Sequence, residues 1–469
     1  MAADEGLCAP VTVGTPPGGT TTAGALTTDL YELSMAASYL RRGMTEPATF
    51  SLFARRLPAR RGFLVAAGLA DALSYLERLS FSEEDLAWLT GHGFSSETAE
   101  QLSTLRFTGD VFAVPEGRAL LPDEPFLEVT APLAEAQLVE TVLVNQFTYQ
   151  TAIATKAARC ILAAGGIELV DFALRRTHGI EAGLAVARAS AIAGFAATSN
   201  VEAARRFGLR ASGTMAHSYV EAFPSEEDAF MAFVEDRPGP VTFLVDTYDT
   251  MSGVEAAIRV MRRLGLSEDL AIRLDSGDLD RLARLARRRL DAAGFPQVRI
   301  FVSGGLDEYD LERLRNAHAP IDAAGVGTRM GVSSDAPSLD SAYKLVAYAG
   351  RPVCKLSEGK VTLPGPKQVH RRGFRRPDVL ATRHEPPPEG AEALLVPVMR
   401  RGRRTDVDLS IDAARRRLEG DLQALPAEAL DLHDPKPQQP VLSVRLARLA
   451  ETLAAEHSGS AQRLEDPTG

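Results

Sequence analysis

The stretch Ala271-Ile272-Arg273-Leu274-Asp275-Ser276-Gly277-Asp278 decides the fold class, because an apolar run leads directly into a polar turn. The apolar run predicts a buried strand, and Asp275 or Ser276 predicts the N-terminal cap of a following helix. A strand that ends in polar residues and passes into a helix is the repeating unit of α/β proteins.

Five further apolar runs alternate with helical patterns on both sides of this stretch. They lie at residues 167–172, 191–196, 242–245, 298–302 and 321–326. So many units predict a parallel sheet with crossover helices, curled into a closed or partly closed, irregular β/α barrel of the TIM type. We assign this barrel to residues 136–345 and expect a helix at 133–160 to lead into it.

The two ends of the chain predict a second, discontinuous α+β domain. Its N-terminal part is residues 25–135, and its C-terminal part is residues 346–455. The expected elements are strands at 48–53, 119–130, 353–356 and 361–365, a helical stretch at 65–103, a helix from about 27 with Thr27, Thr28 and Asp29 as capping residues, and a helix at 441–455.

The two termini and the composition limit the protein's class. Residues 1–24, rich in Pro, Gly and Thr, predict a disordered leader, and residues 456–469 predict a flexible tail. A net charge of -10 over 469 residues argues against nucleic-acid binding. We find no signal peptide or membrane span, and the three scattered cysteines fit reduced thiols, so we expect a cytoplasmic protein.

Polar residues follow the apolar runs, at the points where the predicted strands end. They are Asp171, Arg175, Thr198, Ser199, Asp246, Arg273, Asp275, Ser303 and Thr328. Barrel enzymes place their chemistry at the carboxyl ends of the strands. We therefore expect these side chains to meet at one shared site.

Two glycine-rich loops follow consecutive strands. Gly325-Val326-Gly327-Thr328 and Ser303-Gly304-Gly305 both let backbone N–H groups approach an anion. Glycines after strands also serve as ordinary turn residues, but two such loops in consecutive units indicate a ligand with more than one phosphate.

Arginines at two strand ends indicate an acidic, planar ligand. Arg273 can hold a carboxylate or phosphate with two hydrogen bonds, and Asp275 can hold Mg²⁺ or ribose hydroxyls. Helix capping would explain only part of this segment. Arg175, which is otherwise a solvated surface charge, lies beside Phe172, whose ring suits stacking on a planar ligand. No CxxC or HExxH spacing is found, so the ligands of any metal stay unassigned.

His217 is the histidine that we single out from eight. Most histidines are structural or surface groups, but this one lies in Gly213-Thr214-Met215-Ala216-His217-Ser218, after the apolar run 209–211 and between hydroxyl groups. A neutral imidazole, with an ordinary pKa of ~6.5, serves as a base or as a nucleophile toward a phosphoryl group.

An ordered series of motifs resembles the nicotinate phosphoribosyltransferases from Leu26 to about Pro440. The motifs are Leu26-Thr27-Thr28-Asp29-Leu30-Tyr31, Phe172-Ala173-Leu174-Arg175-Arg176, Thr198-Ser199-Asn200-Val201, Gly213 to Ser218, Arg273 to Asp278, Gly325 to Thr328, Tyr343-Lys344-Leu345-Val346 and Lys355-Leu356-Ser357.

The resemblance implies that nicotinate and 5-phosphoribosyl-1-diphosphate are joined to give nicotinate mononucleotide and diphosphate, with coupled ATP hydrolysis, in NAD biosynthesis. ATP is then a co-substrate that phosphorylates His217, and Mg²⁺ is the expected cofactor. Thr214 and Arg273 would contact nicotinate, and Thr328 would bind the phosphoribosyl substrate. Tyr31 would stack on the pyridine ring from the neighbouring subunit of a homodimer, so the site would be shared.

Two alternatives stay open beside this interpretation. A nicotinamide phosphoribosyltransferase would carry an acidic residue where this chain has Ser199, and that carboxylate would repel nicotinate. A catalytically silent nucleotide-binding homologue would have no need of a phosphoryl acceptor such as His217. The chain departs from the family pattern at two positions: Ala197 stands where the family commonly has glycine, and Gly305 where relatives often have aspartate. The second departure bears on the ribose or Mg²⁺ contacts near Gly304.

Overall fold

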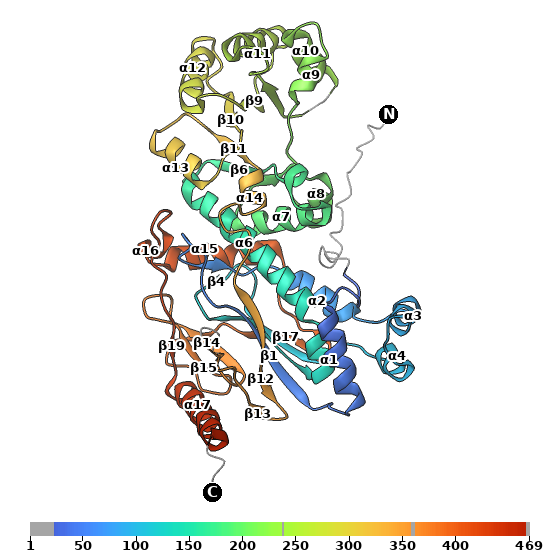
Figure 1. Cartoon of the computed structure of the whole chain (residues 1–469). Helices are drawn as coiled ribbons and strands as arrows, with labels where there is room; N and C mark the ends of the chain where they lie inside the picture. The colour runs from blue at the N-terminus through green and yellow to red at the C-terminus, as the bar shows by residue number, and fades with distance from the viewer. Residues whose placement is uncertain (1–22, 237–238, 358–361, 466–469) are drawn as a thin grey trace, which may run out of the picture.

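The computed structural model describes residues 23–236, 239–357 and 362–465, with side chains up to 456 in the last helix. Figure 1 presents two lobes joined by a long helix. The predicted leader at 1–24 lies, except for its last two residues, outside the described part of the chain. No helix in that part is long and apolar enough to cross a membrane.

A six-stranded parallel sheet forms the upper lobe in Figure 1. Its strand order is β7-β6-β11-β10-β9-β8, and every pairing is parallel. The strands are β6 (Glu168–Asp171), β7 (Ala197–Thr198), β8 (Val241–Leu244), β9 (Leu270–Leu274), β10 (Arg299–Val302) and β11 (Ala323–Val326). Because β7 and β8 are the two ends of this sheet, it forms a partly closed barrel, as predicted.

The predicted strand at 191–196 is wrong. Its first three residues are the end of helix α7 (Ile180–Ala193), and the strand itself is only β7. Ala191 and Ile192 are apolar because α7 buries them, and Gly194 ends the helix with a φ of 114°. A short apolar run looks the same whether a helix or a strand buries it.

Helices connect the strands and cover the sheet. The expected helix at 133–160 is two helices, α5 and α6, which meet at Val139. The set comprises α5 (Leu133–Leu138), α6 (Glu140–Ala164), the 3-10 turn η1 (Leu174–Arg176), α8 (Val201–Phe207), α9 (His217–Glu221), α10 (Glu226–Asp236), α11 (Thr250–Leu264), α12 (Leu279–Ala292), α13 (Glu308–Asn316) and α14 (Thr328–Gly331).

The lower lobe is built on a seven-stranded sheet from both ends of the chain, which confirms the discontinuous α+β unit. The order is β13-β12-β1-β5-β3-β17-β18, and β1 pairs antiparallel with β12, Ala48 opposite Tyr348. The strands are β1 (Pro47–Ala54), β3 (Asp110–Ala113), β5 (Pro125–Pro132), β12 (Ser341–Tyr348), β13 (Arg351–Pro352), β17 (Val396–Arg400) and β18 (Arg403–Arg404).

Smaller elements complete this lobe. The strands are β2 (Leu64–Val65) with β4 (Ala119–Leu120), and a four-stranded sheet of β14 (Lys367–Arg371), β15 (Val379–Thr382), β16 (Glu392–Ala393) and β19 (Val441–Leu442). The helices are α1 (Leu30–Arg41), α2 (Leu69–Arg78), α3 (Glu83–Gly91), α4 (Ser96–Ser103), α15 (Ile411–Ala424), α16 (Ala427–Leu430) and α17 (Val444–Glu465).

Several predicted elements of this lobe need correction. Residues 353–356 are irregular, and so are the described residues of 361–365. In the second segment, Pro364 and Pro366 donate no backbone hydrogen bond and interrupt a ladder. The predicted strand at 119–130 is β4 and β5, separated by a turn at Asp123 with a φ of 62°. Helix α17 begins later and ends later than the predicted 441–455.

Helix α6 joins the two hydrophobic cores. Its first half contributes Phe147 and Ala152 to the core of the antiparallel sheet, and its second half contributes Ile153 and Ala157 to the core of the parallel sheet. Burying one large apolar side chain stabilises a fold by about 1.5–3 kcal/mol. A change in α6 is therefore felt in both cores.

Candidate active site

Arg273 lies at the centre of the polar residues that the parallel sheet collects. It occupies β9 and is 9% exposed. Its Nε donates to Ser303 Oγ at 2.8 Å, Nη1 to Thr214 Oγ1 at 2.7 Å, and Nη2 to Asp275 Oδ1 at 2.6 Å. All three partners were predicted to be site residues. The guanidinium group is therefore fixed in one orientation.

The packed rings of Phe172 and Phe301, which we call the aromatic floor, lie beside this guanidinium group. The Arg273 Cζ atom is 5.4 Å from the centroid of the Phe172 ring, and the Phe301 ring packs 5.5 Å from Phe172. Gly325 makes room for the ring, because a Cβ atom there would meet Phe172 Cδ2 at 2.6 Å. The predicted glycine therefore serves the packing of Phe172, in addition to any role toward an anion.

His217 stands at the edge of the same cluster. It is the first residue of α9, with its Nδ1 3.2 Å from Thr247 Oγ1 and its Nε2 3.8 Å from Asp275 Oδ2. Ser303 also donates to Asp275. Burial opposes the charge of Asp275, but the hydrogen bonds from Ser303 and Arg273 hold the pKa of its carboxyl below the usual value.

Asp246 was among the residues expected at the shared site, whereas Thr247 was not predicted. Asp246 Oδ2 accepts from the backbone N–H of Asp275 at 2.8 Å and from Ser276 Oγ at 2.7 Å. Its Oδ1 is buried and has no hydrogen-bond partner within the described residues. Asp246 could be predicted because it directly follows the apolar run 242–245. Thr247 comes one residue later, where the sequence gives no further signal.

The two glycine-rich loops lie at the ends of the neighbouring strands β10 and β11. Gly304 has a φ of 109°, and a Cβ atom there would collide with the carbonyl oxygen of Asp275. Gly327 precedes α14, so Thr328 opens that short helix. The loops thus border the Arg273 cluster on one side.

Arg175 and Ser199 lie just beyond the ends of the neighbouring strands β6 and β7. The Ser199 N–H donates to the Asp171 carbonyl oxygen at 2.8 Å, and Thr198 Oγ1 donates to the Asp171 carboxylate at 2.7 Å. Burial raises the pKa of the Asp171 carboxyl. Arg175 is exposed on η1, one turn after Phe172. Asp171 has a structural role here, because it fixes the ends of both strands.

Asp29 and Tyr31 are not brought to Arg273 within one chain. They line a separate cleft of about 830 Å³ between α1, α6, α7 and the segment 337–341, and none of the side chains that contact Arg273 lines it. Asp29 holds the N-cap position of α1, but its carboxylate accepts from Thr141 Oγ1 at 3.0 Å, so the predicted capping bond is not formed.

Tyr31 is 47% exposed in this cleft. Burial of its hydroxyl, and then the nearby carboxyls Glu140 and Glu32, raise the pKa of the Tyr31 phenol. Burial also raises the pKa of both carboxyls. The aromatic face therefore stands open to solvent while its hydroxyl is held as a neutral donor.

Comparisons with known proteins agree with this geometry. Residues 26–147 match the nicotinate phosphoribosyltransferase N-terminal domain, and residues 153–341 match the quinolinate phosphoribosyl transferase C-terminal domain. The chain is 48% identical over 449 residues to a nicotinate phosphoribosyltransferase of Mycobacterium tuberculosis, covering 93% of this chain and 96% of that protein. It is 45% identical over 357 residues to the Bacillus subtilis nicotinate phosphoribosyltransferase, covering 74% and 73%.

A solved structure is similar over almost the whole chain. The crystal structure of human nicotinic acid phosphoribosyltransferase has a TM-score of 0.82 at 29% identity, and the match covers 91% of this chain and 99% of that one. The resemblance in the motifs is confirmed by the alignment of whole domains. This chain belongs to the nicotinate phosphoribosyltransferase family.

Proposed function

We propose that this protein joins nicotinate to 5-phosphoribosyl-1-diphosphate, giving nicotinate mononucleotide and diphosphate for NAD biosynthesis. The observation that carries the proposal is the fixed guanidinium of Arg273 beside the Phe172 ring. A flat pyridine ring stacks on an aromatic face, and its carboxylate pairs with a guanidinium group. Membership of the family supports the same reaction.

Nicotinate binds, in this proposal, with its carboxylate toward Arg273 and Thr214 and its ring over Phe172. Ser199 puts no negative charge beside the ring, which favours the acid over nicotinamide. Tyr31 supplies the second stacking face from the neighbouring subunit of a homodimer, because its own chain turns it into the separate cleft.

The phosphoribosyl substrate occupies the two glycine loops, where backbone N–H groups and Thr328 hold its phosphates. Mg²⁺ is the proposed cofactor, and Asp246 and Asp275 are the residues that fit it. The buried Oδ1 of Asp246, which has no hydrogen-bond partner in the described part of the chain, is an oxygen ligand of the kind that Mg²⁺ binds. The ion would neutralise negative charge on the diphosphate leaving group.

ATP is the proposed co-substrate, and His217 accepts its γ-phosphoryl group. A neutral imidazole nitrogen attacks phosphorus, the bond to the β,γ-bridging oxygen breaks, and ADP leaves. The neighbouring hydroxyl of Thr247 and carboxylate of Asp275 orient the ring for this step. The phosphohistidine adds negative charge beside the substrate site, and its hydrolysis afterwards couples ATP to product release.

The most direct test measures mononucleotide formation from nicotinate and from nicotinamide, side by side. We expect turnover of nicotinate and little or none of nicotinamide. A preference for nicotinamide would overturn the substrate assignment, and turnover of neither substrate would favour a catalytically silent homologue.

A labelling experiment tests the role of His217. We expect γ-labelled ATP to give an acid-labile, base-stable label on the wild type and none on His217→Ala. A wild type without this label, or a label that survives in the variant, would contradict the phosphohistidine. The cytoplasmic location stays a prediction from the sequence, and cell fractionation checks it.

A further inference from the structure

The two glycine loops extend beyond the paired residues of β10 and β11, so contacts other than the hydrogen bonds of the sheet must fix the distance between them. The first loop runs from Ser303 through Gly304 and Gly305 to Asp307, which caps α13. The second is Gly327 and Thr328 at the start of α14. A ligand held by both loops gains most when they are fixed beforehand, because ordering loops during binding costs free energy.

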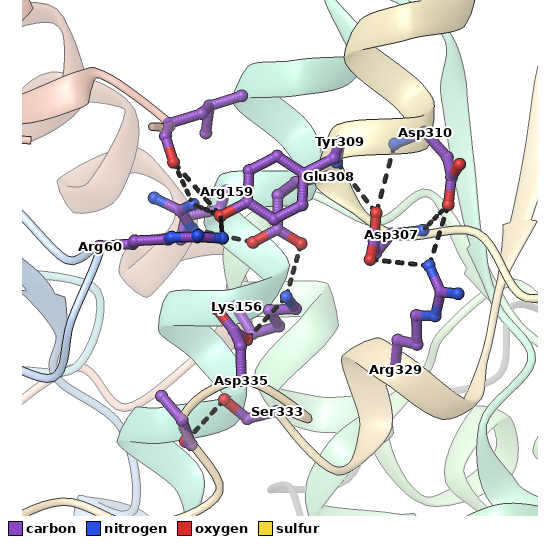
Figure 2. Close-up of polar contacts among 12 residues, drawn as sticks. Arg60, Lys156, Arg159, Asp307, Glu308, Tyr309, Asp310, Arg329, Ser333 and Asp335 are labelled. Carbon is purple, nitrogen blue, oxygen red and sulfur yellow. Dashed lines mark hydrogen bonds and ion pairs between the residues drawn. The ribbon is translucent and has the colours of Figure 1, made fainter. Parts of the chain in front are cut away.

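Arg329 connects these loops directly. Its Nη1 donates to Asp307 Oδ2 at 2.9 Å and to Asp310 Oδ2 at 3.1 Å, and both carboxylates lie in the first turn of α13 (Figure 2). Asp307 also accepts from the backbone N–H groups of Tyr309 and Asp310. Arg329 follows Thr328 in the chain, so its side chain ties one loop to the end of the other.

A second, buried connection runs beneath the first. Lys156 of α6 lies 2.5 Å from Glu308 and 2.7 Å from Asp335, and its side chain is 1% exposed. Arg159, also on α6, donates to Glu308 at 3.0 Å. Figure 2 presents both connections, with Arg329 on one side and Lys156 on the other. The buried connection fixes the base of the loops, and Arg329 fixes their outer part.

The exposure of Arg329 separates its role from that of the buried pair. Its side chain is 50% exposed, and exposed ion pairs contribute about 0–1 kcal/mol to stability. Removal of Lys156 would leave the carboxylate of Glu308 buried with one cation fewer, which is costly to the fold. Arg329 can therefore be replaced without loss of the fold, and its position between the two loops indicates a role in fixing their spacing.

We propose that Arg329 is a positioning residue for 5-phosphoribosyl-1-diphosphate, which holds the Gly304-Gly305 loop and the Gly327-Thr328 loop at the spacing that the substrate's phosphates require. The inference rests on the proposed function for the identity of the ligand. Arg329 does not touch the reacting atoms. It acts through the backbone of both loops.

The test compares Arg329→Ala with Arg313→Ala in the full-length protein. Arg313 pairs with the same Asp310 at 3.3 Å and is 60% exposed, but both residues lie on α13, so that pair joins no loops. We expect Arg329→Ala to raise the KM and the Kd for 5-phosphoribosyl-1-diphosphate on the order of tenfold, the lower end of what supporting residues contribute at metal sites. The kcat and the KM for nicotinate should stay near the wild-type values, because the phosphates are held in the ground state and the transition state alike.

Arg329→Lys should recover part of the loss, since an ammonium group reaches one carboxylate but not two. Equal KM values for the Arg329→Ala, Arg313→Ala and wild-type proteins would overturn the proposal. A fall in kcat at unchanged KM and Kd would also overturn it, because it would assign Arg329 to the chemical step.

Amide hydrogen exchange keeps this inference separate from the proposed function. We expect faster exchange at Gly304 to Asp307 and at Thr328 to Gly331 in Arg329→Ala, and wild-type exchange there in Arg313→Ala. This measurement needs no substrate, so it decides on the connection even if the wild type turns over no nicotinate. Unchanged exchange in Arg329→Ala would contradict the inference, while absence of nicotinate turnover in the wild type would contradict the proposed function alone.

Discussion

The Arg273 cluster and the Tyr31 cleft differ in how complete they are within one chain. At Arg273, side chains from several strand ends use their hydrogen bonds on one another, which fixes a guanidinium group beside an aromatic ring. At Tyr31, an aromatic ring stands half open in a cleft of about 830 Å³. A prearranged group binds without reorganisation, whereas an open one needs a partner. In the proposed homodimer, the Arg273 cluster would be the half of the site that one chain finishes, and Tyr31 would be the open half that this chain offers to its neighbour.

The largest expected effect is at the finished half. Lysine at 273 keeps the charge but loses the fork that reaches Ser303, Thr214 and Asp275 together. We expect Arg273→Lys to lower kcat/KM for nicotinate by about 100-fold or more, since each lost hydrogen bond to a charged group costs about 1.5–3 kcal/mol. Steady-state kinetics measure this.

Arg205→Lys is the matched control, because Arg205 is exposed on α8 and pairs with Glu202 on the same helix. We expect wild-type kinetics there. An Arg273→Lys enzyme with the wild-type rate would mean that any nearby positive charge suffices. The fixed geometry of the Arg273 cluster would then not matter for activity.

The open half gives the next effect. Tyr31→Ala should lower kcat/KM about tenfold, because aromatic stacking contributes about 0.5–1.5 kcal/mol beyond burial. If Tyr31 serves the neighbouring subunit, refolding Tyr31→Ala together with Arg273→Ala creates dimers that hold one intact site. The mixture should then be several-fold more active than the mean of the two separate variants. A mixture that equals the mean would show that the two residues do not complete a shared site.

The aromatic floor gives an intermediate effect. Gly325→Ala would push a methyl group against the Phe172 ring at 2.6 Å. Overpacking of this kind destabilises a core by about 1–3 kcal/mol, and the displaced ring should also raise the KM for nicotinate. Thermal unfolding and steady-state kinetics measure the two effects.

Gly420→Ala is the control for this change, since a Cβ atom at that position on α15 meets nothing within 4 Å. We expect it to be neutral or to stabilise by up to about 1 kcal/mol, because alanine favours helix over glycine. Equal unfolding temperatures for the two variants would mean that the Phe172 ring is free to move. The ring would then not be fixed beside Arg273.

The smallest effect concerns pH, because the carboxyl pKa values of the two regions are shifted in opposite directions. Burial raises the pKa of Glu140, whereas the hydrogen bonds from Ser303 and Arg273 outweigh burial and lower the pKa of Asp275. The raised pKa of Glu140 stabilises the fold below the carboxyl's ordinary pKa, and this contribution is lost as the pH rises through the raised value. Glu140→Gln should therefore stabilise the protein by on the order of 0.5–1 kcal/mol at pH 7 and much less at pH 4.

Asp275→Asn should do the opposite. The lowered pKa of Asp275 contributes stability at neutral pH, which is lost as the pH falls through that lowered value. The variant should lose stability at pH 7 and approach the wild type in acid. Denaturant unfolding at several pH values measures both, and pH dependences of the same sign would remove this difference between the regions.

Much of the fold could be predicted from the alternation of apolar runs and helical patterns. The predicted strand at 191–196 is an exception. The run Ala191 to Ala196 has the composition of a buried strand and yet ends a helix, because burial makes both elements apolar. Only the position of Gly194, directly after the last helical residue, marks the boundary. The strand ends after residues 274, 302 and 326 were better defined, since a polar residue or a glycine directly follows each of them.

Some of the candidate site could likewise be predicted from the sequence, and some could not. Arg273, Asp275 and Ser303 were predictable because parallel strands bring their carboxyl ends to one edge of a sheet. The bond from Thr247 to His217 was not, because it joins a turn after β8 to the first residue of α9, and no periodicity governs such a contact. The separation of Tyr31 from Arg273 within one chain depends on how the two lobes pack, which local patterns do not encode.

The pairing of β1 with β12 has a consequence for how this protein is made. Ala48 meets Tyr348, its partner in the sheet, only after about 300 further residues have been added, which takes about 15–60 s at the usual rate of about 5–20 residues per second. During that time β1 has no neighbour on this side, and an unpaired strand edge invites association with other chains. Synthesis of this protein therefore includes an interval in which chaperones have a strand to protect.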